Sequence, residues 1–186
     1  MNSLILKSAS PRRKEILEFL GLKFKIEPSH LNESEIQGEK PLDYLKRVTI
    51  HKLEKGKSLK WNTYISSDTI VVIGDRILQK PKDFNEGMEM ISKLSGNKHF
   101  VYSGIGILTD EILIYDFDCT EILFYPLSEM QIKEYLVQYK PYDKAGGYGI
   151  QDGYPLVKSY DGSYQNVVGF PIRKFLKYIQ YWQEFL

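Results

Sequence analysis

The chain has 186 residues, of which 42% are hydrophobic and 26% are charged, and this composition is typical of a globular protein that we expect to form a single domain over residues 1–186. The formal net charge of +1 argues against a nucleic-acid polymer as partner, and the single cysteine, Cys119, excludes an internal disulfide and a multi-cysteine metal site. No apolar run approaches the length of a membrane span, and Leu4-Ile5-Leu6 is too short for the apolar region of a signal peptide, so we expect a cytoplasmic protein without a membrane partner.

The first predicted elements are a short buried strand and a helix, joined by a serine-rich turn. The strand covers about residues 3–7. Ser10 stands at the expected N-cap and Pro11 at the first helical position, and apolar residues at helical spacing continue to Leu20 before Gly21 ends the run. A strand, a short turn and a helix N-terminus together form the place where α/β proteins bind phosphorylated ligands.

The first turn of this helix carries Arg12, Arg13 and Lys14, which is the unfavourable end for cations. Because the helix dipole makes the N-terminus positive, each such charge costs about 0.3–1 kcal/mol unless an anion arrives. Arg13 also occupies the position that a capping box gives to Glu or Gln. The alternative is that the arginines point into solvent or pair with a carboxylate. The buried strand before them favours a phosphate site made of amides, hydroxyls and guanidiniums.

The middle of the chain places an acid inside an apolar pattern. The predicted elements are a strand at residues 24–26, a polar loop over 29–40, a helix over 41–57, and strand-like runs at 64–67, 70–73 and 76–78. Gly74-Asp75 fits a two-residue hairpin turn. Asp68-Thr69 lies between two strand-like runs, and an acid there is costly to bury without a partner. Asp68 is therefore either a turn residue at a strand end, or a metal ligand or general base facing a cleft.

The second half combines capped helices with a strand-rich meander. The predictions are a helix from the Asp83 cap to about Ser95-Gly96, strands over 98–125 interrupted at 109–111, a helix from the Ser128 capping box to Lys140-Pro141, a glycine-rich region over 143–170, and a last helix from about Pro171 that buries Phe175, Leu176, Ile179 and Trp182. Helices alternate with strands early in the chain and a meander follows, which predicts an α/β fold with a mixed sheet.

The residues that could do chemistry are carboxylates and cations. Lys80 is either a phosphate partner or a solvated lysine. The three glycines within residues 146–149 allow a backbone to approach a ligand closely. His30, His51 and His99 lack metal-ligand spacing. An anion site together with hard carboxylate ligands suggests Mg²⁺-assisted chemistry on a phosphate ester or anhydride.

At this point the sequence resembles the Maf family of nucleoside triphosphate pyrophosphatases over nearly its whole length. The matching motifs, in chain order, are Ser8-Ala9-Ser10-Pro11-Arg12-Arg13, Glu33, Lys52, Ser67-Asp68-Thr69, Lys80-Pro81, Leu94-Ser95-Gly96, Asp143-Lys144-Ala145-Gly146, Tyr148-Gly149-Ile150-Gln151, Gly162-Ser163-Tyr164 and Val167-Val168-Gly169. The resemblance implies an elongated, two-lobed α/β fold with a central mixed β-sheet flanked by helices, similar to the inosine triphosphatase fold. It also implies cleavage of a nucleoside triphosphate into the monophosphate and pyrophosphate.

The resemblance further implies a role for each matching residue. Asp68 is the expected catalytic acid that activates water, and Glu33 is its companion in binding a divalent cation, Mg²⁺ or Mn²⁺. The residues expected to contact the triphosphate are Ser8, Ser10, Arg13, Lys52 and Lys80, and those expected to set base preference are Arg12, Thr69 and Gln151. The last three match the subgroup that acts on dTTP and UTP. The alternative function is a nucleotide-binding regulator of septum formation with little turnover, and a homodimer is a possible assembly.

Two departures from the family pattern lie beside these residues. Ser66-Ser67 replaces the usual Gly-Ala before the Asp-Thr pair, and Leu53 replaces the usual Ala after Lys52. Both departures predict a local change in packing.

Overall fold

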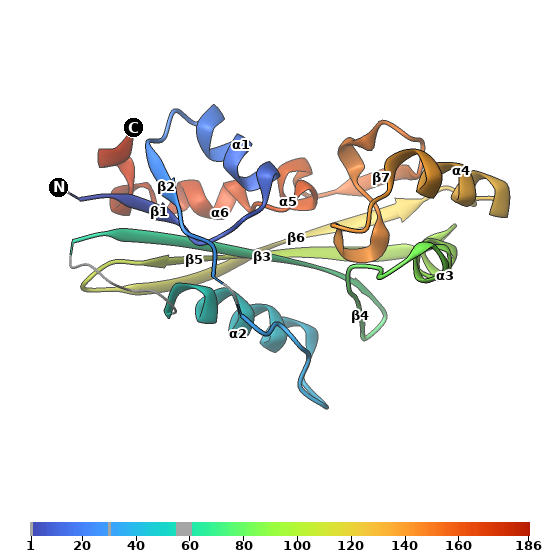
Figure 1. The fold of residues 1–186 in the computed structure, drawn as a ribbon, viewed down its shortest axis with the longest axis horizontal. Coiled ribbons are helices and arrows are strands. Elements are labelled where there is room, and N and C mark those ends of the chain that lie inside the picture. The colour runs from blue at the N-terminus through green and yellow to red at the C-terminus, as the bar shows by residue number, and fades with distance from the viewer. Residues whose placement is uncertain (1, 30, 55–60) are drawn as a thin grey trace. The chain divides into compact units, whose positions relative to one another are not determined.

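The computed structural model describes residues 2–29, 31–54 and 61–186 (Figure 1). Its strands are β1 (Leu4–Leu6), β2 (Phe24–Ile26), β3 (Thr63–Ile73), β4 (Arg76–Leu78), β5 (Lys98–Leu108), β6 (Leu113–Phe124) and β7 (Val157–Asp161). Its α-helices are α1 (Pro11–Phe19), α2 (Pro41–Glu54), α3 (Phe84–Leu94), α4 (Glu129–Tyr139), α5 (Tyr164–Val168) and α6 (Ile172–Lys177). Short 3-10 turns are η1 (Ala145–Gly147), η2 (Ile150–Asp152), η3 (Ile179–Tyr181) and η4 (Gln183–Phe185).

The strands form a mixed sheet with the order β2-β1-β3-β5-β6-β7, and β4 pairs with β3. β1 is parallel to both β2 and β3, whereas β4 and β7 are antiparallel to their neighbours β3 and β6. The predicted α/β fold with a mixed sheet is therefore confirmed. None of the described helices is long and apolar enough to cross a membrane.

The contacts divide the chain into two compact units. Unit 1 consists of Met1–Asp68, Ser103–Asp118 and Gly169–Leu186, and unit 2 consists of Thr69–Tyr102 and Cys119–Val168. Three strands, β3, β5 and β6, continue covalently from one unit into the other. Each unit has its own hydrophobic core. The expectation of a single domain stays a prediction.

In unit 1, helices cover both faces of the strands. Helix α2 lies on one face, and α1 and α6 lie on the other (Figure 1). On the α1 and α6 face, the core contains Leu4, Leu6, Leu17, Leu22, Ile65, Ile105, Ile107, Phe170, Phe175, Trp182 and Phe185. On the α2 face, a smaller cluster joins Ile5, Leu53, Tyr64 and Leu108. Successive side chains of β1 thus alternate between the two faces, as the pleat of a strand requires.

The prediction of the first helix is confirmed to within one residue. Pro11 occupies the first turn, and Gly21, with a φ of +81°, terminates the segment in a conformation that favours glycine. Ser10 holds the N-cap position in an extended conformation, but its side chain makes no capping hydrogen bond. The predicted position of the N-cap is therefore confirmed.

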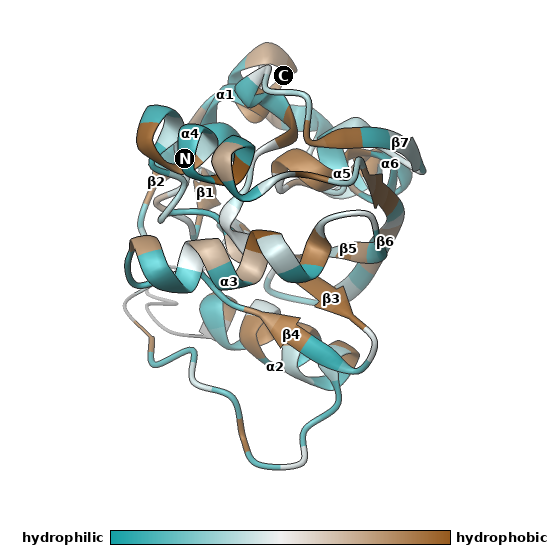
Figure 2. Ribbon diagram, turned by 90° about the vertical axis from the view of Figure 1, so that its right-hand side faces the viewer, coloured by the Kyte–Doolittle hydropathy of each residue, from teal (hydrophilic) through white to brown (hydrophobic). Residues whose placement is uncertain are grey.

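Unit 2 confirms the predicted hairpin and both predicted helix caps. Gly74-Asp75 connects β3 to β4, with Ile73 paired to Arg76. The Asp83 side chain accepts a hydrogen bond from Glu86 N, and Ser128 forms a complete capping box with Gln131. Helices α3 and α4 alternate hydrophobic and hydrophilic residues around their axes (Figure 2). Their apolar faces meet residues of β3, β5 and β6 in the core.

Several boundaries differ from the prediction. The expected runs 64–67 and 70–73 form one continuous strand, β3, so Asp68 lies within a strand and not at its end. The predicted end of the second helix, residues 55–57, lies outside the described residues. Strand β7 was not predicted, because its sequence lacks an alternating apolar pattern and its residues are mostly exposed.

The C-terminal prediction is partly wrong. Helix α6 ends at Lys177 and is followed by two 3-10 turns. Phe175 and Trp182 are buried as predicted, and their rings stack with centroids 4.2 Å apart. Leu176 and Ile179 are 44% and 41% exposed, because the regular helical period on which their burial was predicted stops between them.

Candidate active site

The centre of the candidate site in unit 1 is a lysine between two carboxylates. Lys52 Nζ lies 2.6 Å from Asp68 Oδ1 and 3.0 Å from Glu33 Oε1. Lys52 comes from the last turn of α2, Asp68 from β3 and Glu33 from the segment between β2 and α2. Lys52 and Asp68 are both largely buried. A buried ion pair offsets the cost of removing its charges from water only when its geometry is good and its remaining polar atoms are hydrogen-bonded. The structure thus brings together three of the predicted site residues.

The segment that carries Glu33 is fastened to α2. The Tyr44 hydroxyl donates to the Glu33 carbonyl oxygen at 2.8 Å. Arg47 donates from Nε and Nη2 to the two carboxylate oxygens of Glu39 at 2.6 and 2.7 Å, and from Nη2 to the Ser34 carbonyl oxygen at 3.0 Å. Glu33 is therefore held at a fixed place although its segment has no regular secondary structure. Neither Tyr44 nor Arg47 stood out in the sequence, because each works through the backbone or a neighbour.

The serines before Asp68 fix β3 from both faces. Ser66 Oγ donates to the Thr49 carbonyl oxygen of α2 at 2.7 Å, whereas Ser67 Oγ donates to the Gly169 carbonyl oxygen at 3.4 Å. Both serines are fully buried. Their hydrogen bonds satisfy hydroxyls that would otherwise be costly inside the protein. Leu53 is itself buried in the α2-face cluster, and the change in packing relative to the family stays a prediction.

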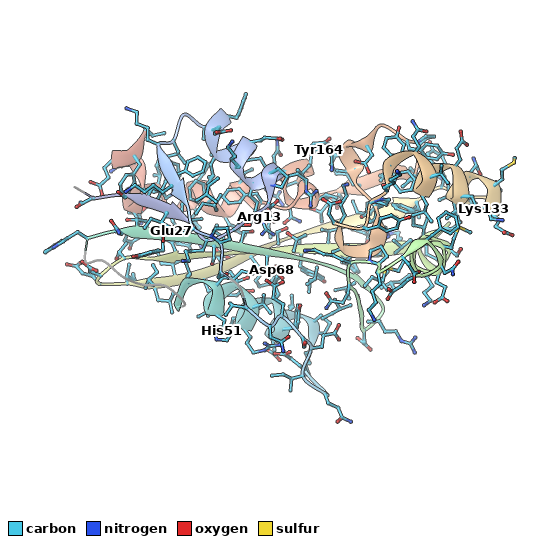
Figure 3. All side chains as sticks on the ribbon, in the orientation of Figure 1. Arg13, Glu27, His51, Asp68, Lys133 and Tyr164 are labelled. Carbon is cyan, nitrogen blue, oxygen red and sulfur yellow. The ribbon has the colours of Figure 1, made fainter. Side chains whose placement is uncertain are left out.

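Arg13 does not point into solvent. Its Nε donates to the Gly169 carbonyl oxygen at 2.9 Å, and its Nη1 donates to Ser8 Oγ at 2.9 Å. Figure 3 labels both Arg13, at the start of α1, and Asp68, on β3. Burial lowers the pKa of the Arg13 guanidinium, and the carboxylates of Asp68 and Glu33 act against this effect. Arg13 therefore shares an electrostatic environment with the Lys52 cluster.

The serine-rich turn places further polar groups beside Arg13. Ser8 is buried, and its Oγ accepts from both Arg13 and the backbone amide of Ser10, the latter at 3.3 Å. Ser10 and Arg12 are each half-buried. Four predicted residues thus lie in the turn before α1 or in its first turn, and Ser8 and Arg13 are in direct contact.

Unit 2 contains the other predicted site residues. Thr69 lies on β3 and is half-buried, Lys80 is exposed after β4, and Gln151 is exposed in the 3-10 turn η2. They are described within unit 2 alone, so the structure tests no contact between them and Asp68.

The turn that carries Gln151 is fixed by a buried tyrosine. Tyr135 Oη donates to Asp152 Oδ2 at 2.6 Å and accepts from the Gly149 amide at 3.0 Å. A Cβ on Gly149 would lie 2.7 Å from both Gln151 Nε2 and Asp152 Oδ1, so a larger residue there would displace these two side chains. Tyr135 and Asp152 are therefore positioning residues for this turn that sequence reasoning missed.

The glycines before this turn serve packing within unit 2. Gly146 and Gly147 both have a φ of +70°. A Cβ on Gly146 would lie 3.0 Å from Val71, and one on Gly147 would lie 3.3 Å from Pro81. That these glycines let the backbone approach a ligand stays a prediction, and within unit 2 they leave room for the side chains of Val71 and Pro81.

A divalent cation could be held by Glu33 and Asp68. Among the described residues, no three or more His, Cys, Asp or Glu side chains form a complete metal site. However, Mg²⁺ is commonly held by one or two carboxylates together with substrate phosphates and water. Glu33 and Asp68 both present an oxygen to Lys52 Nζ, so they fit such an incomplete, hard-oxygen site.

Comparisons with known proteins agree with the residue pattern. The family model described as "Maf-like protein" matches residues 3–182. The dTTP/UTP pyrophosphatase of Leptospira interrogans is 46% identical over 98% of this chain and 97% of its own length. The proteins of the same name from Leptospira borgpetersenii and Clostridium perfringens are 47% and 39% identical, over 98% and 95% of both chains in each pair. The structure of a nucleoside-triphosphatase / dITP/XTP pyrophosphatase from Mycobacterium abscessus aligns with 97% of this chain and 95% of that one, at a TM-score of 0.47 and 9% identity.

Proposed function

The chain belongs to the Maf family, and from that premise we propose that it is a metal-dependent pyrophosphatase that hydrolyses dTTP and UTP to the nucleoside monophosphate and pyrophosphate. The observation that carries the proposal is the carboxylate pair of Glu33 and Asp68 around Lys52. The buried Arg13, on whose guanidinium the charges of Asp68 and Glu33 act, supports the same assignment. Similarity to relatives named dTTP/UTP pyrophosphatase supports the choice of substrate.

In the proposed reaction, a water oxygen forms a bond to the α-phosphorus while the bond from that phosphorus to the bridging oxygen breaks. Pyrophosphate is the leaving group. The Asp68 carboxylate accepts the proton that the attacking water loses. Arg13 and Lys52 bind phosphate oxygens and stabilise the negative charge that develops on them.

Glu33 and Asp68 are the residues that would hold Mg²⁺ or Mn²⁺. When bound, the ion would polarise the α-phosphate and lower the pKa of an attacking water. Lys52 keeps the two carboxylates oriented toward one point. The Ser8 hydroxyl and the α1 N-terminus add hydrogen-bonding groups next to Arg13.

We assign the preference for a pyrimidine base to Thr69 and Gln151. The Gln151 amide offers both a donor and an acceptor, and the Thr69 hydroxyl offers either. Thymine and uracil present alternating acceptor and donor groups along one edge. A base that leaves such groups unpaired is disfavoured by about 1–3 kcal/mol per group.

Product analysis across a panel of nucleotides tests the proposal. The protein is incubated with UTP, dTTP, GTP and dATP in the presence of Mg²⁺, Mn²⁺ or EDTA, and products are separated by anion-exchange chromatography. We expect UMP, dTMP and pyrophosphate with either metal, and little product with EDTA. Nucleoside diphosphate and orthophosphate as first products contradict the pyrophosphatase assignment. Full activity in EDTA contradicts metal dependence, and tight UTP binding without turnover points to the binding-only alternative.

A further inference from the structure

Lys7 is a second buried lysine next to the candidate site, and neither the proposed mechanism nor the resemblance uses it. Its side chain is 4% exposed. Its one ion-pair partner among the described residues is Glu27, whose carboxylate lies 3.9 Å from Lys7 Nζ, beyond hydrogen-bond distance. The Glu27 side chain is 44% exposed. A buried ammonium is costly unless it is both paired and hydrogen-bonded. This lysine therefore has capacity for a further anion.

The register of the sheet places Lys7 on the same face as Asp68. Leu6 is opposite Ile65 in the parallel pair of β1 and β3, and the Lys7 amide donates to the Ile65 carbonyl oxygen at 2.7 Å. Lys7 is consequently opposite Ser66. Asp68 follows two residues later on the same face, about 7 Å along the strand.

Contacts with α2 identify this face independently. Ile5, two residues before Lys7, packs with Leu53 of α2. Ser66 donates to the Thr49 carbonyl oxygen of α2, and Asp68 pairs with Lys52 of α2. Side chains two residues apart in a strand lie on the same face, so Lys7, Ser66 and Asp68 share the face that α2 covers.

The charges of the cluster show why one more cation matters. Glu33 and Asp68 carry two negative charges, which Lys52 and Arg13 balance. The charges of these four side chains sum to zero, so one further cation nearby strengthens the attraction for a substrate with several negative charges. Lys7 supplies an additional cation, because Glu27 holds it only at long range and from a partly solvated position.

We propose that Lys7 is a further substrate-binding residue. When the nucleotide binds, the Lys7 ammonium breaks its ion pair with Glu27 and contacts the polyphosphate. The inference rests on the proposed function and extends its binding site by one residue. The proposal predicts opposite effects for the two partners of the ion pair. Loss of Lys7 removes a charge-assisted hydrogen bond to the polyphosphate, whereas loss of the Glu27 charge removes a competitor for Lys7.

The experiment is a calorimetric titration with inorganic tripolyphosphate in Mg²⁺ buffer, which needs neither base recognition nor turnover. We expect Lys7→Met to raise Kd by about tenfold or more, which is the scale of a hydrogen bond to a charged group. We expect Glu27→Gln to lower Kd by about two- to threefold. The matched control is Lys25→Met, which removes the same charge from an exposed lysine of β2 and should leave Kd within twofold.

A Lys7→Met protein that melts normally and binds tripolyphosphate within twofold of wild type overturns the proposal, as does a wild-type protein that does not bind tripolyphosphate. If Lys7→Met does not fold, Glu27→Gln decides: an unchanged or raised Kd then shows that the pair is only structural. Pyrophosphate release from UTP is measured separately. A wild-type protein that binds tripolyphosphate through Lys7 but releases no pyrophosphate contradicts the proposed function and leaves the Lys7 assignment standing.

Discussion

Asp68 can be tested by a change that preserves its shape. Asp68→Asn keeps an oxygen that can accept from Lys52 Nζ but removes the charge that a general base needs. We expect kcat for UTP to fall by about a thousandfold, within the range that a general base contributes, while the melting temperature changes little. Asp43→Asn, on an exposed acid of α2, is the control. An unaltered kcat in a well-folded Asp68→Asn protein shows that Asp68 has a structural role only.

Arg13→Ala separates two opposing effects. The helix dipole alone predicts that loss of this cation stabilises the protein. The structure predicts the opposite, because the Gly169 carbonyl oxygen and Ser8 Oγ both lose a buried donor. We expect the free energy of unfolding to fall by about 1–3 kcal/mol and KM for UTP to rise.

Lys14→Ala is the matched control for Arg13→Ala, since Lys14 is exposed on the same helical turn. It should change neither KM nor stability appreciably. A rise in stability for Arg13→Ala determined by urea unfolding contradicts the role assigned to its two hydrogen bonds.

At the residue scale, the sequence identifies unusual side chains more readily than it identifies the residues that these side chains contact. Arg13 stands out because its charge is at the wrong end of a helix, which is a local signal. The partners of Lys52 are not predictable in this way, because Asp68 is 16 positions away and Glu33 lies in an irregular segment. Lys7 directly precedes the Ser8–Arg13 motif, and its burial follows from the pairing of β1 with two strands.

At the element scale, the turn that carries Gln151 depends on Tyr135. Tyr135→Phe removes a hydroxyl that donates to Asp152 and accepts from the Gly149 amide. We expect this variant to lose about 1–2 kcal/mol of unfolding free energy and to reduce the ratio of kcat/KM for UTP over that for GTP. Gln151→Ala should reduce the same ratio, because it removes the group assigned to base reading.

Tyr139→Phe is the control for this element. Tyr139 stacks on Tyr135 with centroids 5.1 Å apart, but its hydroxyl only accepts a bond from the exposed Gln138 side chain. It should leave the ratio unchanged. An equal fractional loss of activity toward UTP and GTP in Tyr135→Phe would argue that the turn does not affect base choice.

Elements defined by local signals are the ones that the sequence predicts correctly. The caps at Asp83 and Ser128 need only residues within one helical turn, and both hold in the structure. Strand β3 was predicted as two runs, because Asp68-Thr69 interrupts the strand-like pattern directly after Ser66 and Ser67. Their buried hydrogen bonds and the ion pair with Lys52 allow the strand to continue, and these partners come from distant segments.

At the scale of the whole molecule, His99 links stability to pH. It is fully buried on β5, where Nε2 lies 2.8 Å from the Tyr148 hydroxyl. Burial lowers the pKa of His99 from 6.5 to about 4. The folded state therefore binds this proton less readily than the unfolded state. The stabilising contribution of neutral His99 is complete above about pH 6.5 and is lost as the pH falls toward 4.

We expect the free energy of unfolding to fall by roughly 3 kcal/mol between pH 7 and pH 4 on account of this residue. Urea unfolding at several pH values measures it. His99→Gln should flatten the pH dependence in this range, whereas His51→Gln, on an exposed histidine of α2, should not. If the free energy of unfolding changes equally with pH in His99→Gln and in wild type, the pH dependence comes from other groups.

The position of Lys52 between Glu33 and Asp68 has a consequence for handling the enzyme. In the proposed metal site, the two carboxylates repel each other when the ion is withdrawn, and the ammonium of Lys52 offsets that repulsion from within the chain. Protein treated with a chelator should therefore be inactive but stably folded, with a melting temperature close to that of the metal-loaded protein. Turnover should return in full when Mg²⁺ is added back, even after long storage.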